Sequence, residues 1–241
     1  MDKVVPRLAE WLRVKTVEAG RRGLVLGLSG GIDSAVAAVL CREAFPHNSL
    51  GVIMPCFSHP QDADDARLVA AHLGLETETV DLNDVFTTFL KQLSGEEYTE
   101  ANKSDLAVAN IKPRLRMTAL YYFAARHRYL VVGTGNRSEI MIGYYTKYGD
   151  GGADLLPLAN LLKAEVRELA RYLKLPERVI EKAPSAGLWD DHNDELELGI
   201  TYQELDDYLM HGRGSERVQN IVNSLIERNR HKREMPPIPP F

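Results

Sequence analysis

A short apolar run that ends in a glycine-rich turn constrains this chain more than any other feature. Residues 24–28, Leu-Val-Leu-Gly-Leu, predict a buried strand. The turn Ser29-Gly30-Gly31-Ile32-Asp33-Ser34 follows at once, and the Ala-rich segment that begins at Ser34 is typical of a helix. A strand, a tight turn and a helix in this order place backbone amides at the start of a helix, where they converge on an anion.

The same alternation of strand and helix continues along the chain. Further strands are expected at residues 50–54, 76–82 and 129–133, and helices at 2–18, 34–45, 63–73, 85–93 and 105–127. Three more helices are expected near 163–174, 202–210 and 215–230. Because strands that alternate with helices pair in parallel, we predict an α/β fold with a doubly wound, mainly parallel sheet and a helical C-terminal extension. Ligands of such sheets bind at the carboxyl ends of the strands.

Composition excludes several classes of protein. A length of 241 residues fits one domain, residues 1–241. The formal net charge of −5 argues against a nucleic-acid binder. Cys41 and Cys56 are too few for a disulfide framework or a cysteine-rich zinc site, and no run approaches the roughly 18 apolar residues of a membrane span. We therefore expect a soluble cytoplasmic protein with neither a nucleic-acid nor a membrane partner.

The turn at residues 29–34 predicts a phosphate site that includes a cation. Its glycines allow close approach of the backbone, and Ser29 and Ser34 add hydroxyl donors. Asp33 would repel a phosphate unless it holds a cation that the phosphate also touches, which indicates Mg²⁺. The turn lacks the Gly-Lys-Ser/Thr of a Walker A loop. It resembles instead the SGGxDS loop of the N-type ATP pyrophosphatases, which cleave ATP to AMP and pyrophosphate.

Two later segments narrow the choice within that superfamily. Gly133-Thr134-Gly135-Asn136-Arg137-Ser138-Glu139 follows the strand at 129–133 and so opens onto the same sheet edge. There the hydroxyl of Thr134 could meet the nucleotide, and Glu139 could complete a magnesium site with Asp33. Residues 143–158, GYYTKYGDGGADLLPL, hold too many glycines and charges for a core and indicate a substrate loop.

Together these segments closely resemble the NAD synthetase family over nearly the whole chain. The resemblance implies an adenine nucleotide alpha hydrolase-like fold and a ligase that amidates deamido-NAD to NAD through an acyl adenylate, with ATP as cosubstrate and release of AMP and pyrophosphate. It implies Asp33, Lys163 and Glu139 as catalytic residues, with Mg²⁺ on Asp33 and Glu139.

The ATP contacts that the resemblance implies are Gly27, Leu28, Ser29, Gly30, Gly31, Ile32, Asp33, Ser34, Thr134, Lys163 and Ser185. The deamido-NAD contacts are Arg114, Lys147, Asp154, His231 and Lys232, with Asn110, Tyr121, Asp150 and Glu197 as further candidates. Arg116, Tyr144 and Tyr148 are interpreted as helix-surface or packing residues.

The nitrogen donor and the assembly follow from the same resemblance. Glutamine-dependent relatives carry an extra amidase domain, and no segment here is large enough to be one, so we expect free ammonia as donor. A homodimer with substrate sites at its interface is also implied. The segment at 56–61 and Lys15 depart from several family members, which leaves the adenine and nicotinate ring contacts open.

Two alternatives remain open on sequence grounds. One is a related ATP pyrophosphatase, such as a GMP synthetase or a tRNA-thiolating enzyme, which would use the same loop without the run at 146–158. The other is a nucleotide-binding sensor that has kept the fold and lost catalysis.

Overall fold

The computed structural model describes residues 2–185, 187, 189 and 193–240. Its sheet has four parallel strands in the order β3-β2-β1-β4. The strands are β1 (Leu24–Gly27), β2 (Ser49–Ile53), β3 (Glu76–Thr79) and β4 (Leu130–Val132). All four predicted strands are confirmed, and so is their parallel pairing.

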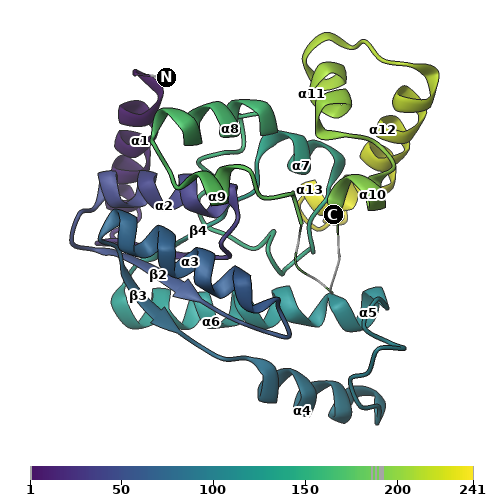
Figure 1. Cartoon of the computed structure of the whole chain (residues 1–241), viewed down its shortest axis with the longest axis horizontal. Helices are drawn as coiled ribbons and strands as arrows, with labels where there is room; N and C mark the ends of the chain where they lie inside the picture. Colours follow the sequence, from purple (N-terminus) through teal and green to yellow (C-terminus); the bar gives the residue numbers. More distant parts are fainter. Residues whose placement is uncertain (1, 186, 188, 190–192, 241) are drawn as a thin grey trace.

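Helices cover both faces of the sheet, as Figure 1 shows. One face packs against α1 (Val4–Glu18), α2 (Ile32–Ala44), α3 (Pro60–Leu73), α8 (Lys163–Tyr172) and α9 (Glu177–Ile180). The other packs against α4 (Asn83–Ser94), α5 (Leu106–Ala109) and α6 (Ile111–His127). Side chains alternate along a strand, so Leu24 and Leu26 of β1 join the first core and Val25 joins the second. The doubly wound architecture predicted from the sequence is confirmed.

The predicted helix at 105–127 is wrong as one continuous element. The structure divides it at Asn110 into α5 and α6. Pro113 lies in the first turn of α6, where its missing N–H costs nothing, but it would interrupt a helix that ran through from residue 105.

The C-terminal helices form a third apolar cluster beside the sheet layers (Figure 1). They are α10 (Asp194–Leu198), α11 (Tyr202–His211) and α12 (Glu216–Arg228), and they pack with α7 (Arg137–Ile142), which follows β4. The short helix α13 (Arg230–Arg233) follows α12 and buries none of its residues. The sequence did not predict α7, α9, α10 and α13, because four to six residues are too few to show a helical period. Within the described part of the chain, no helix is both long and apolar enough to cross a membrane.

The order of the strands brings two polar loops together. Strands β2 and β3 extend the sheet on one side of β1, and β4 then returns to its other side. The loops after β1 and β4 therefore flank the point where strand order reverses, the usual ligand position in such sheets. Asn136, which caps α7, donates from Nδ2 to Asp33 Oδ1 at 2.9 Å and so joins the two loops directly.

Gly30 allows the turn after β1 to lie against α3. Its φ is +76°, and a Cβ at this position would meet the Asp62 carbonyl oxygen at 2.4 Å and the Asp65 Cβ at 2.8 Å. Both neighbours belong to α3, and the Asp62 atom is backbone, so a side chain could not be accommodated by rotation of a neighbour. The shape of the phosphate turn therefore depends on this glycine.

We expect Gly30→Ala to damage both stability and nucleotide binding. Gly95→Ala is a matched control, because Gly95 has a φ of +75° with nothing within 4 Å of its added Cβ. Both changes place a Cβ on a left-handed backbone, which costs about 1–2 kcal/mol. Only Gly30→Ala adds a steric penalty of about 1–3 kcal/mol. Urea unfolding and calorimetric titration with Mg·ATP would measure the difference, and equal losses in the two variants would contradict this account.

Candidate active site

A cavity of about 1050 Å³ opens where β1, β2 and β4 end. Its walls come from the turn after β1, the loop after β4, the predicted substrate loop, the start of α8 and the C-terminal helices. The volume lies at the upper end of the roughly 300–1,000 Å³ range usual for small-molecule sites. Its place is the one that the strand pattern predicts for a ligand.

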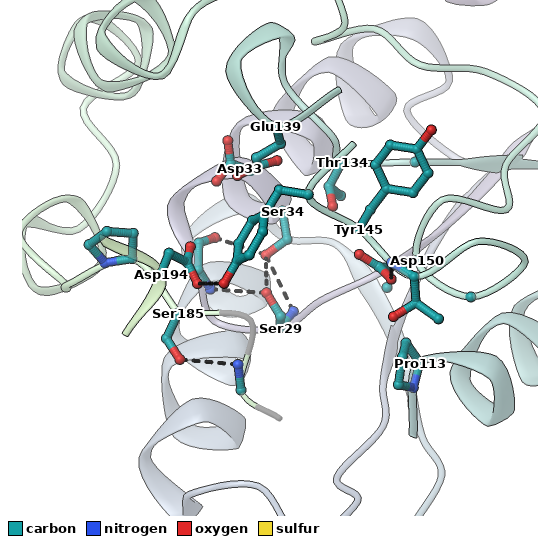
Figure 2. A pocket seen from close by; sticks show the side chains of 18 of the residues that line it. Ser29, Asp33, Ser34, Pro113, Thr134, Glu139, Tyr145, Asp150, Ser185 and Asp194 are labelled. Atoms are coloured by element: carbon teal, nitrogen blue, oxygen red, sulfur yellow. Dashed lines mark hydrogen bonds between the residues drawn. The ribbon is translucent and has the colours of Figure 1, made fainter. Parts of the chain in front are cut away.

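The turn after β1 is held in shape by its own serines (Figure 2). Ser34 Oγ donates to the Gly31 carbonyl at 2.8 Å and lies 3.1 Å from Ser29 Oγ, which accepts from the Gly31 N–H at 3.2 Å. The N-cap of α2 is Gly31, and no side chain caps its first amides. Amides left without a side-chain cap at a helix N-terminus are the donors that bind phosphate.

A buried ion cluster stands beside this turn. Lys163 Nζ lies 2.5 Å from Asp33 Oδ2 and 3.2 Å from Glu139 Oε1. The Lys163 side chain is 4% exposed and each carboxylate is 17% exposed. Figure 2 shows the two carboxylates together at the top of the pocket. The structure therefore brings together the three residues that the sequence singled out for catalysis.

The cluster fits a divalent cation. Two carboxyl groups share one ammonium, so a bound cation would stabilise both of them in their charged forms, and both supply the oxygen ligands that Mg²⁺ prefers. Among the described residues, no group of three or more His, Cys, Asp or Glu side chains could hold a metal. A Mg²⁺ ion held by Asp33 and Glu139 would keep coordination positions open to phosphate and water, which are common ligands of Mg²⁺ in proteins.

Burial and neighbouring charges shift the pKa values of Glu139 and Lys163 for different reasons. Burial raises the pKa of Glu139 to about 7, and the charge of Asp33 adds to the rise while Lys163 opposes it. Burial by itself would lower the pKa of Lys163, but the charges of Asp33 and Glu139 raise it above its ordinary value. Lys163 therefore stays an ammonium and can offer its charge to a phosphate.

Most of the predicted ligand residues line this cavity. From the predicted ATP and metal sets, the lining residues are Gly27, Leu28, Ser29, Gly31, Ile32, Asp33, Ser34, Thr134, Glu139, Lys163 and Ser185. From the predicted deamido-NAD set they are Asn110, Asp150, Glu197 and Lys232. Gly30 lies behind the turn against α3. In the substrate loop, Thr146 bridges two of these residues, since its Oγ1 bonds Asn110 Oδ1 at 2.5 Å and its N–H donates to Asp150 Oδ1 at 2.8 Å.

Five predicted substrate contacts do not line the cavity: Arg114, Tyr121, Lys147, Asp154 and His231. Asp154 secures the outer edge of β4, because its Oδ2 accepts from the Val131 N–H at 2.8 Å and its Oδ1 from the Tyr121 hydroxyl at 3.1 Å. Lys147 donates to the His231 carbonyl. Their role toward a substrate stays a prediction.

Sequence reasoning missed several cavity residues. Arg116 and Tyr144, interpreted as surface or packing residues, both line the cavity, whereas Tyr148 does not. Arg116 donates from Nε to the Met54 carbonyl at 3.1 Å and from Nη2 to Ser58 Oγ at 2.9 Å. The signal available for Arg116 was its position two residues after Arg114, in the same segment that carries the family resemblance. Further lining residues outside the predicted ligand sets include Arg167, Lys182, Asp194 and Arg228.

The shifted pKa of Glu139 predicts a pH effect on the ligand-free protein. An exposed Glu has a pKa of about 4.3, and the folded value is about 7. Between these values the folded protein holds a proton that unfolding releases, so the free energy of unfolding falls as the pH rises through this window. We expect Glu139→Gln to flatten that fall.

Urea unfolding at several pH values without ATP or Mg²⁺ would check this prediction. The control is Glu216→Gln, a change of an exposed residue at the start of α12. If stability depended on pH equally in the wild type and in Glu139→Gln, the buried carboxyl would not be the titrating group.

Comparisons with known proteins identify the family of this chain. The family model described as NAD synthase matches residues 4–236. A Carboxydothermus hydrogenoformans protein described as an NH(3)-dependent NAD(+) synthetase is 54% identical over 238 residues, which are 99% of this chain and 97% of the relative.

Solved structures extend the likeness to the fold. The structure of NMN synthetase from Francisella tularensis has a TM-score of 0.93 and 38% identity, and the match covers 100% of this chain and 98% of that one. The NH3-dependent NAD synthetase from Campylobacter jejuni has a TM-score of 0.79 and 31% identity over 98% and 97% of the two chains. With a family model matched over residues 4–236 and a relative of 54% identity along its length, this chain belongs to the NAD synthase family.

Proposed function

We propose that this chain is an ammonia-dependent NAD synthetase, a ligase that converts deamido-NAD to NAD with ATP as cosubstrate. The observation that carries the proposal is the cluster of Asp33, Lys163 and Glu139 beside the phosphate turn. These residues come from segments after β1, after β4 and at the start of α8, yet they meet at one end of one cavity. The description of the 54% identical relative supports the same activity.

In the first step, a nicotinate carboxylate oxygen attacks the α-phosphorus of ATP and pyrophosphate leaves. The amides at the start of α2 and the hydroxyls of Ser29 and Ser34 stand where they can hold the departing pyrophosphate. Lys163 offsets charge that develops on the phosphates. Asp33 and Glu139 are the residues that would hold Mg²⁺, which supplies further positive charge when bound.

In the second step, ammonia attacks the activated carbonyl carbon and AMP leaves. The carbon–nitrogen bond of the amide forms as the bond between the carbonyl carbon and the AMP oxygen breaks, and the nitrogen loses a proton. The chain contributes mainly by positioning, because the acyl adenylate must stay in the cavity until ammonia arrives.

We propose free ammonia as the nitrogen donor. The descriptions of the Carboxydothermus and Campylobacter proteins both specify ammonia, and this chain covers 97% of each of them. A cytoplasmic site of action is part of the same proposal.

We also propose a homodimer that shares its substrate sites. Arg114, Lys147, Asp154, His231 and Tyr121 lie outside the lining of one protomer's cavity. A substrate that extends from the cavity toward these residues could meet side chains of either subunit.

The two alternatives left by the sequence are less well supported. Membership of the NAD synthase family argues against a GMP synthetase or a tRNA-thiolating enzyme. The intact cluster of Asp33, Lys163 and Glu139 argues against a sensor without catalysis, since a sensor would not need both carboxylates and the ammonium.

A product assay with ATP, Mg²⁺ and deamido-NAD tests the activity, with ammonium or glutamine supplied in parallel reactions. We expect equal amounts of NAD and AMP with ammonium alone. Asp33→Ala should fold and lose turnover by about a hundredfold or more, because it removes a proposed ligand of the Mg²⁺ ion that offsets charge on the phosphates. AMP without NAD would refute the proposed acceptor or donor, and near-normal turnover in Asp33→Ala would refute the metal assignment.

A second candidate substrate is nicotinate mononucleotide. The observation that favours it is the TM-score of 0.93 with a structure described as NMN synthetase, against 0.79 for an NAD synthetase. Competition between deamido-NAD and nicotinate mononucleotide in one reaction, with both amides quantified by chromatography, decides between them. We expect NAD to dominate, and an excess of NMN would instead assign the mononucleotide as substrate.

A further inference from the structure

Tyr202 reaches the ion cluster from the C-terminal helices. It is the first residue of α11 and is 1% exposed. Its hydroxyl lies 3.3 Å from Glu139 Oε1 and 3.1 Å from Asp194 Oδ2. Its ring lies under the Lys163 ammonium, with Nζ 4.9 Å from the ring centroid. One side chain from a distant helix therefore contacts both Glu139 and Lys163.

The surroundings of Tyr202 hold its ring in one place. A capping box between Thr201 and Glu204 begins α11, and the Tyr202 N–H donates to Glu195 Oε1 at 2.8 Å. The ring packs in the third apolar cluster with Leu205. Burial raises the pKa of the Tyr202 phenol, and the charges of Glu139 and Asp194 raise it further, so the phenol keeps its proton. A phenol has one proton to donate, so the hydroxyl bridges the two carboxylates as donor to one of them at a time.

The same helix also holds the backbone of Lys163. Asp206, one turn after Tyr202, accepts from the Ala164 N–H at 2.9 Å and from Ser138 Oγ. Ser138 Oγ in turn accepts from the Lys163 N–H at 3.0 Å. A carboxylate at a helix N-terminus satisfies free amides there, so Asp206 caps α8 from another helix. Helix α11 thus anchors the backbone around Lys163 through Asp206 and the side-chain cluster through Tyr202.

We propose that Tyr202 is a positioning residue of the reaction, which holds Glu139 through its hydroxyl and Lys163 through its ring in the arrangement that receives Mg·ATP. The inference rests on the proposed function only in its assignment of ATP to this cavity. Without the hydroxyl, Glu139 loses a neutral hydrogen-bond partner. The Lys163 ammonium stays beside Glu139 and draws the Glu139 carboxylate away from a metal ion.

The test compares Tyr202→Phe with Tyr208→Phe. Tyr208 belongs to the same helix, its hydroxyl lies 3.0 Å from Asn223 Oδ1, and it does not line the cavity. Each variant loses one tyrosine hydroxyl and keeps its ring. Calorimetric titration with Mg·ATP, without deamido-NAD, measures binding apart from turnover. We expect Tyr202→Phe to remain folded and to bind Mg·ATP about tenfold or more weakly, as for a lost hydrogen bond to a charged group, while Tyr208→Phe binds as the wild type does.

Steady-state kinetics provide the second readout. Tyr202→Phe should lower kcat and leave the KM for ammonium unchanged, because ammonia enters after adenylation. Wild-type affinity and kcat in Tyr202→Phe would overturn the proposal, and so would an equal loss of affinity in both tyrosine variants. If the wild type bound Mg·ATP but formed no NAD, the proposed function would fail while the binding comparison would still test Tyr202.

A double-mutant cycle separates an effect of the Tyr202 hydroxyl through Glu139 from an independent effect on stability. The free energies of unfolding of the wild type, Tyr202→Phe, Glu139→Gln and the double variant are measured without ligands. Because the two side chains are in contact, their effects should not be additive. Additive effects would show that the hydroxyl does not act through Glu139 and would overturn the proposal.

Discussion

The buried ammonium of Lys163 is the interaction on which the site depends. It is 2.5 Å from Asp33 and 3.2 Å from Glu139, and these residues follow different strands. Removing either carboxylate would leave a buried charge with less compensation, which is the costly way to break such a group. The ammonium thus links the start of α8 to both loops at the reversal of strand order.

A buried ion cluster of this kind is weak evidence that the fold is stable, and it is stronger evidence that the site binds a ligand or catalyses a reaction. Taking charges out of water costs free energy, and ion pairs in protein interiors often do no better than apolar residues of the same size. The raised pKa of Glu139 shows that this carboxyl is not fully compensated by Lys163 in the ligand-free protein. A Mg²⁺ ion beside this turn would supply the missing compensation and hold Glu139 in its charged form.

The ion cluster and the cavity around it are built from both the sheet edge and the C-terminal helices. The sheet edge supplies the phosphate turn and the capped loop at Asn136, and α11 then closes over the ion cluster with Tyr202 and Asp206. A second network joins the far side of the cavity, where Lys182 bonds Asp62 at 2.7 Å and Asp65 at 2.8 Å. The first network connects α11 to the residues after β4 and to the start of α8, and the second connects Lys182 to α3, so both join segments that are distant along the chain.

The sequence by itself predicted the parallel sheet, the glycine-rich turn with Asp33, and Glu139 after the fourth strand, and the family resemblance added Lys163. Local apolar runs predict buried strands, and the residues of the turn determine both its conformation and the groups that it offers to a ligand. Only the tertiary structure decided which side chains surround that cluster. Tyr202 and Asp206 sit in an ordinary amphipathic helix, and Glu139 lies 63 positions from Tyr202 along the chain. Arg116 and Tyr144 likewise have helical or aromatic neighbours that make them look like packing residues. Contacts at such separations depend on how helices pack against the sheet, and a local pattern holds no information about that packing.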